Sequence, residues 1–169
     1  MFEFMYKVIN KVACNLYKLF HPYFWGKRTQ IYGIPKIIEI NKLKLGRDVS
    51  INGGCFFDFI GGGTVEDRVT LSRGVTILTS GLETVDYKEI SKMKYRKHIN
   101  KPVYIGEGTW IAANVTICPG SNIPERCIIA AGSVVVGNLN EADCLYGGIP
   151  ARKIKTLIRN AENDKYDNS

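Results

Sequence analysis

Apolar residues recur at every sixth position over much of this chain. The clearest series runs without interruption from Ile105 to Val135, and a shorter series precedes it from Leu45. A second small or apolar residue stands four positions after most members of the series. A period of six fits neither the 3.6-residue period of a helix nor the two-residue alternation of an open sheet. The repeating positions are Leu45, Ile51, Phe57, Val65, Leu71, Ile77, Ile105, Ile111, Ile117, Ile123, Ile129 and Val135.

A six-residue unit has room for one short strand and one tight turn. Three such units complete a triangular coil, and stacked coils bury their inward aliphatic side chains on one another. The turns need small residues or residues with positive φ, which accounts for much of the glycine, 17 of 169 residues. The pattern therefore predicts an all-β solenoid. A β-sandwich would show period two and longer turns, and the sequence shows neither.

The N-terminal segment has a helical period instead. Apolar residues follow helical spacing and form a stripe, and the lysines of this segment stand between them in the sequence, on other faces of the predicted helix. His21-Pro22 is expected to end the helix. No apolar run approaches the ~20 residues needed to cross a bilayer, and no signal-peptide pattern is present, so we expect a cytoplasmic protein. The amphipathic helix either packs on its own domain or a neighbouring subunit, or lies on the inner face of an anionic membrane through residues 1–24. The stripe consists of Phe2, Met5, Ile9, Val12, Leu16 and Leu19.

The repeat and the segment that closes it resemble the hexapeptide-repeat acyltransferases. Residues 146–154, YGGIPARKI, are similar to the closing signature of that family, except that Ile149 stands where Asn is usual. The segment Thr109-Trp110-Ile111 resembles a motif of its sugar and xenobiotic acetyltransferases. The resemblance covers residues 45 to about 157. It implies a left-handed parallel β-helix with a short C-terminal helix, acetyl-CoA as the acetyl donor, and a homotrimer with active sites between subunits.

The chain is long enough for one domain. We expect residues 1–36 to form the amphipathic helix and a connector, residues 37–157 the β-helix domain, and residues 158–169 the end of a C-terminal helix and a polar tail. The period fails between Ile77 and Ile105, an interval of 28 residues. This interruption predicts a loop, residues 80–102, extruded from one coil.

His98 lies in the extruded loop and is the only histidine of the repeat region. Acetyl transfer from a thioester to a hydroxyl requires removal of a proton during the attack, and a positioned imidazole can accept it near neutral pH. The family resemblance places a catalytic histidine earlier in the loop, where this chain has Leu82 and Glu83. Three alternatives remain: His98 is the general base, Glu83 or Asp86 replaces it, or the protein is inactive and His98 is a solvated loop residue.

Further residues are candidates for binding the acceptor and the donor. Asp58 is expected either to bind the acceptor or to be an outward-facing turn residue, and Trp110 either contacts a substrate or belongs to a subunit interface. Small residues would let the pantetheine arm of coenzyme A approach the coils, and basic residues after the last coil would bind its phosphates. The acceptor candidates are Asp58, Glu83, Asp86 and Trp110; the coenzyme A candidates are Ala112, Ala113, Ala131, Gly132, Arg152 and Lys153.

Composition excludes several other functions. The γ-class carbonic anhydrases share the solenoid, but two of their subunits together contribute three histidines to a zinc site, and this repeat region has only His98. Five cysteines without a CxxC pair predict free thiols and no metal site. The net charge of +7 favours an anionic partner. With no recognised nucleic-acid-binding module and no GxxxxGK[ST] loop, we expect neither nucleic-acid binding nor nucleotide hydrolysis.

The resemblance therefore implies an acetyltransferase that moves an acetyl group from acetyl-CoA to a saccharide hydroxyl. Direct attack assisted by a histidine base is the expected mechanism, and surface polysaccharide biosynthesis is the expected pathway. Two alternatives stay open. The acceptor is a free small molecule, such as an amino sugar, an oligosaccharide or an antibiotic, or the protein is a catalytically silent solenoid scaffold.

Overall fold

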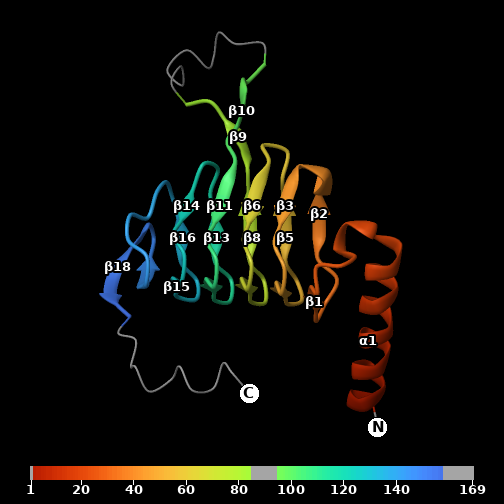
Figure 1. Ribbon diagram of the computed structural model, residues 1–169. Coiled ribbons are helices and arrows are strands. Elements are labelled where there is room, and N and C mark those ends of the chain that lie inside the picture. The colour runs from red at the N-terminus through yellow and green to blue at the C-terminus, as the bar shows by residue number, and fades with distance from the viewer. Residues whose placement is uncertain (1, 85–94, 158–169) are drawn as a thin grey trace.

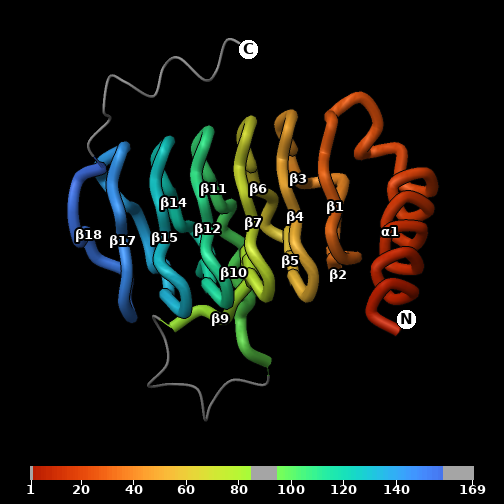
Figure 2. Tube along the Cα trace, turned by 90° about the horizontal axis from the view of Figure 1, so that it is seen from below, coloured from red at the N-terminus to blue at the C-terminus, as the bar shows by residue number. Residues whose placement is uncertain are grey.

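The computed structural model describes residues 2–84 and 95–157. Its body is a stack of triangular coils built from short parallel strands, with helix α1 (Phe2–Phe20) at one end and an antiparallel ribbon projecting from one side (Figures 1 and 2). The all-β parallel solenoid and the N-terminal helix predicted from the sequence are confirmed.

The strands lie on three faces, each a parallel sheet that runs along the stack. The first face ends in a pair of antiparallel strands, and two 3-10 helices, η1 (Pro22–Phe24) and η2 (Ile40–Lys42), belong to the first coil and its approach. The first face contains β1 (Gln30–Ile31), β4 (Ser50–Ile51), β7 (Thr70–Leu71), β12 (Trp110–Ile111), β15 (Ile128–Ile129), β17 (Cys144–Gly148) and β18 (Ala151–Thr156). The second face contains β2 (Lys36–Ile38), β5 (Phe56–Asp58), β8 (Thr76–Leu78), β13 (Thr116–Ile117) and β16 (Val134–Val135). The third face contains β3 (Leu43–Leu45), β6 (Gly63–Val65), β11 (Val103–Ile105) and β14 (Asn122–Ile123).

The six-residue period becomes the core of the stack. Ile111 is in register with Leu71 on one side and Ile129 on the other, so aliphatic side chains of neighbouring coils lie directly against one another. Burying each of these side chains contributes about 1.5–3 kcal/mol. Gly106 shows how close the coils come, because a Cβ there would lie 2.4 Å from the backbone nitrogen of Glu125. The fully buried members, each 0% exposed, include Ile77, Ile105, Ile111, Ile117, Ile123, Ile129 and Val135.

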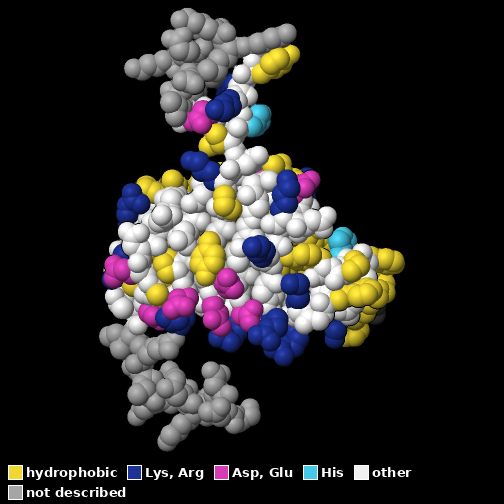
Figure 3. Space-filling model, turned by 45° about the horizontal axis from the view of Figure 1, so that its top comes forward, with side chains coloured by type: hydrophobic (Ala, Val, Ile, Leu, Met, Phe, Trp, Pro, Cys, Tyr) yellow, Lys and Arg dark blue, Asp and Glu magenta, His cyan; other side chains and the backbone are white. Residues whose placement is uncertain are grey.

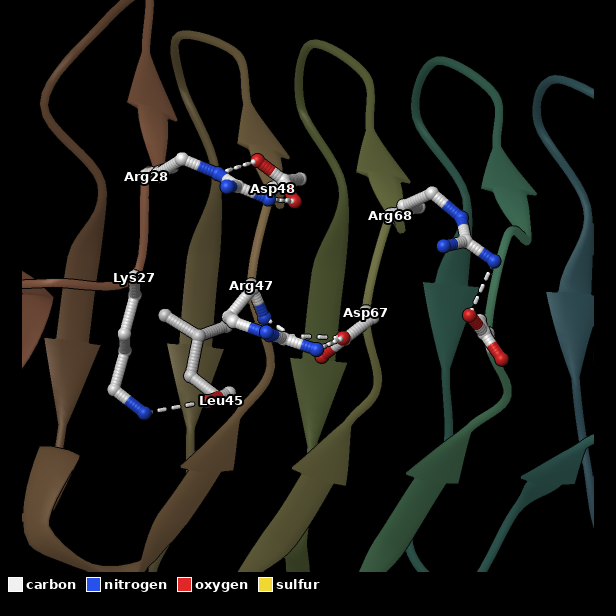
Figure 4. Close-up of polar contacts among 8 residues, drawn as sticks. Lys27, Arg28, Leu45, Arg47, Asp48, Asp67 and Arg68 are labelled. Carbon is white, nitrogen blue, oxygen red and sulfur yellow. Dashed lines mark hydrogen bonds and ion pairs between the residues drawn. The ribbon is translucent and has the colours of Figure 1, made fainter. Parts of the chain in front are cut away.

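One turn position, two residues before most strands of the first face, has positive φ in every coil. Glycine occupies it once, and charged residues otherwise adopt the left-handed conformation there. These residues and their neighbours form ion pairs from coil to coil, which we call the charge ladder. Figure 4 shows the pairs of Arg28, Arg47 and Arg68. The turn positions are Arg28, Asp48, Arg68, Gly108, Arg126 and Asp143. The ladder pairs are Arg28–Asp48, Arg47–Asp67, Arg68–Glu107 and Arg126–Asp143.

Helix α1 contacts the first coil through a narrow face only. Cys14 is buried, and the side-chain amide of Asn10 donates a hydrogen bond to the carbonyl oxygen of Tyr32 at 2.8 Å. The helix therefore packs on its own domain through the side that carries Cys14. The apolar stripe is exposed in the described part of the chain, with side chains from Met5 (48%) to Phe2 (87%). Figure 3 shows hydrophobic side chains gathered at this end of the molecule. Among the described helices, none has the length and hydropathy needed to cross a membrane.

The chain closes the stack with a strand where the sequence predicted the start of a helix. After a turn at Ile149-Pro150, β18 folds back antiparallel to β17, so the helix prediction is wrong for residues 151–156. The physical reason is the free edge of β17, whose backbone groups need partners, and β18 supplies them. The predicted helix end and tail at 158–169 lie outside the described residues.

The interruption of the repeat leaves the coil between β8 and β11. Its two described ends form the antiparallel strands β9 (Ser80–Leu82) and β10 (His98–Asn100), a ribbon that stands clear of the coils in Figure 1. The ribbon connects the second face to the third face, so both of its ends start from the same corner of the triangle.

The charge ladder predicts a specific dependence of stability on pH. The hydrogen bond from Arg28 lowers the pKa of Asp48 below its ordinary value of 3.8. Because the folded-state pKa is the lower one, this stabilisation is complete above about pH 4 and is lost as the pH falls through the folded-state value. In Asp48→Asn, which keeps a residue that tolerates positive φ, we expect the free energy of unfolding to fall less steeply from about pH 4 to about pH 2 than in the wild type.

Denaturant unfolding at a series of pH values measures these slopes. Glu66→Gln, which removes the same charge outside the ladder, is the matched control and should keep the wild-type slope. Equal slopes for Asp48→Asn and the wild type would show that the ladder does not contribute.

Candidate active site

A buried hydrogen-bond network fixes the base of the ribbon to the coil. The hydroxyl of Thr79, which is fully buried, donates to the carbonyl oxygen of Asp58 and accepts from the backbone nitrogen of Gly61, both at 2.8 Å. At the other end of the ribbon, the backbone nitrogen of Lys101 donates to the carbonyl oxygen of Thr79 at 2.8 Å. Both ends of the ribbon are therefore held at one point.

Asp58 belongs to this network. Its side chain is buried, one carboxylate oxygen accepts a hydrogen bond from the backbone nitrogen of Ile60 at 2.9 Å, and the other accepts one from the hydroxyl of Ser80. The interpretation of Asp58 as an outward-facing turn residue is therefore wrong. Its carboxylate orients the first residue of β9, and a direct contact with an acceptor stays a prediction.

His98 and Glu83 lie on the ribbon, outside the body of the coil. His98 is exposed and opposite Leu82 in the antiparallel pair, and the backbone nitrogen of Glu83 donates to the carbonyl oxygen of Lys97 at 2.8 Å. Within the described part of the chain, the His98 ring makes no hydrogen bond or ion pair. A base needs an orienting contact, and one copy of residues 2–84 and 95–157 does not provide it. Asp86, the third loop candidate, lies outside the described residues.

Trp110 lies on the outer side of the first face. The residue is 48% exposed, and its indole nitrogen donates to the hydroxyl of Ser72, one coil earlier, at 2.9 Å. The hydrogen bond fixes the ring against the coil while leaving its surface open to a substrate or another subunit. Ser72 was not anticipated from the sequence, because the link depends on the stacking of coils whose residues are 38 positions apart.

The small residues predicted for coenzyme A binding lie together at another corner. They occupy the turns between the first and second faces of two neighbouring coils, where the backbone nitrogen of Gly132 donates to the carbonyl oxygen of Ala113 at 2.9 Å. Ala131 and Gly132 are exposed, and no atom lies within 4 Å of the place where a Cβ on Gly132 would be. Ala112 is buried, and its backbone nitrogen donates a hydrogen bond to the carbonyl oxygen of Ile129. We call the corner formed by these four small residues the notch.

Arg152 and Lys153 are neighbours on β18 with different surroundings. Lys153 donates to the carboxylate of Glu141 at 2.5 Å, and this hydrogen bond raises the pKa of the lysine. Arg152 is exposed and lines a groove at the end of the stack, of about 290 Å³. The other residues of this groove are apolar and were not predicted: Val134, Val136, Ile149 and Pro150. The only sign of this apolar groove in the sequence was Ile149, which stands where the closing signature usually has Asn.

The predicted site residues thus form separate groups in one chain. The ribbon starts at the corner between the second and third faces, the notch lies between the first and second faces, and the Arg152 groove lies at the end of the stack. Figure 3 shows basic side chains on the described part of the ribbon, away from the coils. The structure brings the members of each group together and does not bring His98 to the notch.

Comparison with known proteins identifies the repeat. Residues 102–137 match the family model described as bacterial transferase hexapeptide (six repeats). WbbJ of Escherichia coli (strain K12), provisionally named a lipopolysaccharide biosynthesis O-acetyl transferase, is 25% identical over 132 residues, which cover 78% of this chain and 59% of WbbJ.

Two solved structures share the fold. A maltose O-acetyltransferase from Clostridium difficile 630 is 25% identical, with a TM-score of 0.67, and the match covers 79% of this chain and 68% of that protein. A hexapeptide-repeat acetyltransferase of Vibrio cholerae complexed with acetyl coenzyme A has a TM-score of 0.68 at 23% identity, with coverage of 83% and 76%.

Residues 102–137 therefore carry the hexapeptide repeat of bacterial transferases, and the fold of the stack is similar to that of hexapeptide-repeat acetyltransferases. The chain spans about half the length of the curated relatives it matches, for example 45%, 44% and 59% of three of them.

The network at the ribbon base predicts a local effect of Asp58→Asn. The amide cannot accept from both Ile60 and Ser80 as the carboxylate does, and a hydrogen bond to a charged group contributes about 1.5–3 kcal/mol. We expect the backbone amides of Gly61 and Lys101 to exchange with solvent about tenfold faster or more, as measured by hydrogen exchange, while the coil amides keep their protection.

Ser80→Ala removes the same side-chain bond and should reproduce part of the effect, and Glu66→Gln should not. Unchanged exchange at Gly61 and Lys101 in Asp58→Asn would show that Asp58 does not hold the ribbon.

Proposed function

We propose that this protein is an acetyltransferase that moves an acetyl group from acetyl-CoA to a saccharide hydroxyl during surface polysaccharide biosynthesis. The observation that carries the proposal is a hexapeptide coil with a ribbon that bears an exposed His98 beside an otherwise continuous stack. The names of similar proteins support it, since they act by name on maltose and in lipopolysaccharide biosynthesis, and one was solved with acetyl coenzyme A.

In this proposal the pantetheine arm lies in the notch formed by Ala112, Ala113, Ala131 and Gly132. Arg152 binds the phosphates of coenzyme A, because its guanidinium is exposed and carries no carboxylate partner among the described residues. Lys153 contributes less than the sequence predicted, since Glu141 already pairs with it. Trp110, held by Ser72, offers a ring face to the acceptor or the arm.

His98 acts as the general base. A ring nitrogen takes the proton of the acceptor hydroxyl while the hydroxyl oxygen attacks the thioester carbonyl carbon; the carbon–sulfur bond then breaks, and the thiolate of coenzyme A takes up the proton. The ribbon that carries His98 leaves one corner of the coil, and the notch lies at another corner. The site therefore needs the ribbon of one subunit and the notch of another. The protein is therefore proposed to be a homotrimer with three such sites.

Two alternatives keep the same fold. A free small acceptor, such as an amino sugar, an oligosaccharide or an antibiotic, would use the same chemistry. A catalytically silent scaffold is favoured by one observation, the absence of any side-chain partner of His98 within the described part of the chain.

The exposed stripe of α1 supports a further part of the proposal. We propose that residues 1–24 contact the cytoplasmic face of a membrane, which would bring the enzyme close to a lipid-linked acceptor. The support is an apolar face that no element among residues 2–84 and 95–157 covers, including Ile9 (62% exposed) and Leu16 (48% exposed).

His98→Ala tests the assignment of the base. Loss of a general base lowers kcat by about 10²–10⁴, and we expect KM for acetyl-CoA to change little, because His98 does not bind the donor. Release of free coenzyme A thiol with saccharide acceptors measures the rate. Lys97→Ala, the neighbouring exposed ribbon residue, is the control and should keep most of the activity.

The outcomes separate the proposals. An active His98→Ala refutes the base assignment alone. A wild-type protein that transfers no acetyl group to any saccharide refutes the acetyltransferase proposal and favours the scaffold.

The membrane contact predicts that Ile9→Ser/Leu16→Ser binds vesicles containing phosphatidylglycerol at least tenfold more weakly than the wild type. Each side chain contributes about 1.5–3 kcal/mol when its apolar surface is buried. Co-sedimentation measures the binding. Phe4→Ser/Asn15→Ser, which changes exposed residues outside the stripe, is the matched control.

Equal vesicle binding by the two double variants would contradict the membrane proposal. Loss of the oligomer in Ile9→Ser/Leu16→Ser, with no vesicle binding by the wild type, would assign the stripe to a neighbouring subunit.

A further inference from the structure

A second side of α1 faces a groove that none of the functions above uses. Figure 2 shows the backbone of α1 beside β1. The groove lies between α1 and the first coil and has a volume of about 520 Å³. Its helix wall carries Lys7, Lys11 and Lys18, and its coil wall carries Gln30 and Tyr32. We call it the lysine groove. The hydrogen bond from Asn10 to the carbonyl oxygen of Tyr32 joins the two walls.

The three lysines form one line along the helix. Positions 7, 11 and 18 fall on the same side of an α-helix, and the line from the first to the last is about 16 Å long at 1.5 Å per residue. None of the described residues that line the groove is acidic. Cys14 at its floor does not offset the charge, because burial raises the pKa of its thiol. The groove therefore presents an extended row of positive charge.

Two of these lysines are available to a ligand. Lys7 forms an exposed ion pair with Glu3 at 2.8 Å. In the part of the chain that the structure describes, the side chains of Lys11 and Lys18 make no ion pair. An adjoining hollow shares Asn15 and Lys18 with the groove and extends it toward Trp25.

The lysine groove is distinct from the apolar stripe proposed to contact a membrane. Lys11 and Lys18 each follow a stripe residue, Ile9 and Leu16, by two positions, which is about 200° around the helix. When the stripe rests on a bilayer, these lysines point away from the lipid. Attraction to the lipid headgroups therefore does not account for them.

The remaining lining is suited to a saccharide. Tyr6 and Tyr32 are 67% and 57% exposed and offer ring surfaces, while Gln30 and Asn15 offer amide donors and acceptors. A row of separated charges with aromatic rings and amides fits a chain that carries repeated acidic groups better than it fits a single small anion.

We propose that the lysine groove binds an acidic saccharide chain through its carboxylate or phosphate groups. The inference deepens the proposed function, on which it rests for the identity of the acceptor, by naming the acceptor as an acidic polysaccharide. The groove lies at the α1 end of the stack, and the notch lies several coils away, on the coils of β12 and β15. The groove would therefore hold a part of the polymer away from the unit that is acetylated.

The test is direct binding in the absence of acetyl-CoA, by isothermal titration calorimetry at low salt. The probes are an oligogalacturonate, which carries carboxylates, a dextran phosphate, which carries phosphates, and neutral dextran. We expect at least one acidic probe to bind, neutral dextran not to bind, and Lys11→Gln/Lys18→Gln to weaken the acidic probe by about tenfold.

Matched variants separate the groove from general charge. Lys36→Gln/Lys44→Gln removes the same charge from the coil surface outside the groove and should change affinity by less than about twofold. Tyr32→Phe should keep the affinity for the acidic saccharide probes. Tyr32→Ser should weaken binding of these probes and leave binding of inorganic polyphosphate, which has no sugar ring, unchanged.

Three results would overturn the inference. The two lysine double variants could weaken binding of the acidic probe equally, or a single-stranded oligonucleotide could bind equally well with the same dependence on Lys11 and Lys18. Lys11→Gln/Lys18→Gln could also lose vesicle binding and keep saccharide binding. A wild-type protein that acetylates neutral saccharides but binds no acidic probe overturns this inference alone. A protein that binds an acidic probe through the groove but transfers no acetyl group overturns the acetyltransferase proposal alone.

Discussion

Each coil of this protein can bury its inward side chains only on the coils above and below it. Ile111 lies between Leu71 and Ile129, and the same contact repeats along all three faces, so the core is a column shared by neighbours. Two consequences follow. The ends of the column must be covered, which α1 with η1 does at one end and β18 at the other. An insertion can leave only through a turn, because a strand with extra residues would break the register, and the ribbon accordingly leaves at a corner that Thr79 holds in place.

The sequence predicted the parts of the fold that depend on the repeat and missed those that depend on what the repeat leaves uncovered. The period of six identified the buried aliphatic residues directly, because burial recurs with the coil. The segment after Pro150 carries no such period, and its strand forms because β17 has a free edge. The burial of Asp58 could not be read from its phenylalanine neighbours, because its partner Ser80 stands 22 positions later in the chain.

The candidate site divides in the same way. Residues that share a turn of neighbouring coils, such as Ala113 and Gly132, were grouped correctly because the repeat fixes their register. The distance between His98 and the notch depends on a ribbon that leaves the column, and on other copies of the chain, neither of which a period describes. The lysine groove was missed for a different reason. The apolar stripe dominates the helical pattern of α1, and only the structure shows that the opposite side faces the first coil.

The net charge of +7 gains a physical meaning from the way that charges are paired. The four arginines of the charge ladder each have a carboxylate partner on a neighbouring coil, so they are neutralised within the column and serve its register. Exposed pairs of this kind each contribute little stability. Because the ladder arginines are paired, the excess positive charge of the protein comes from other residues. Lys11 and Lys18 of α1 and Arg152 of β18 carry unpaired charge within the described residues, at the two ends of the stack. In the two proposals these ends bind different anions, the acidic saccharide at α1 and the phosphates of coenzyme A at β18, so the two ligands do not compete for one surface.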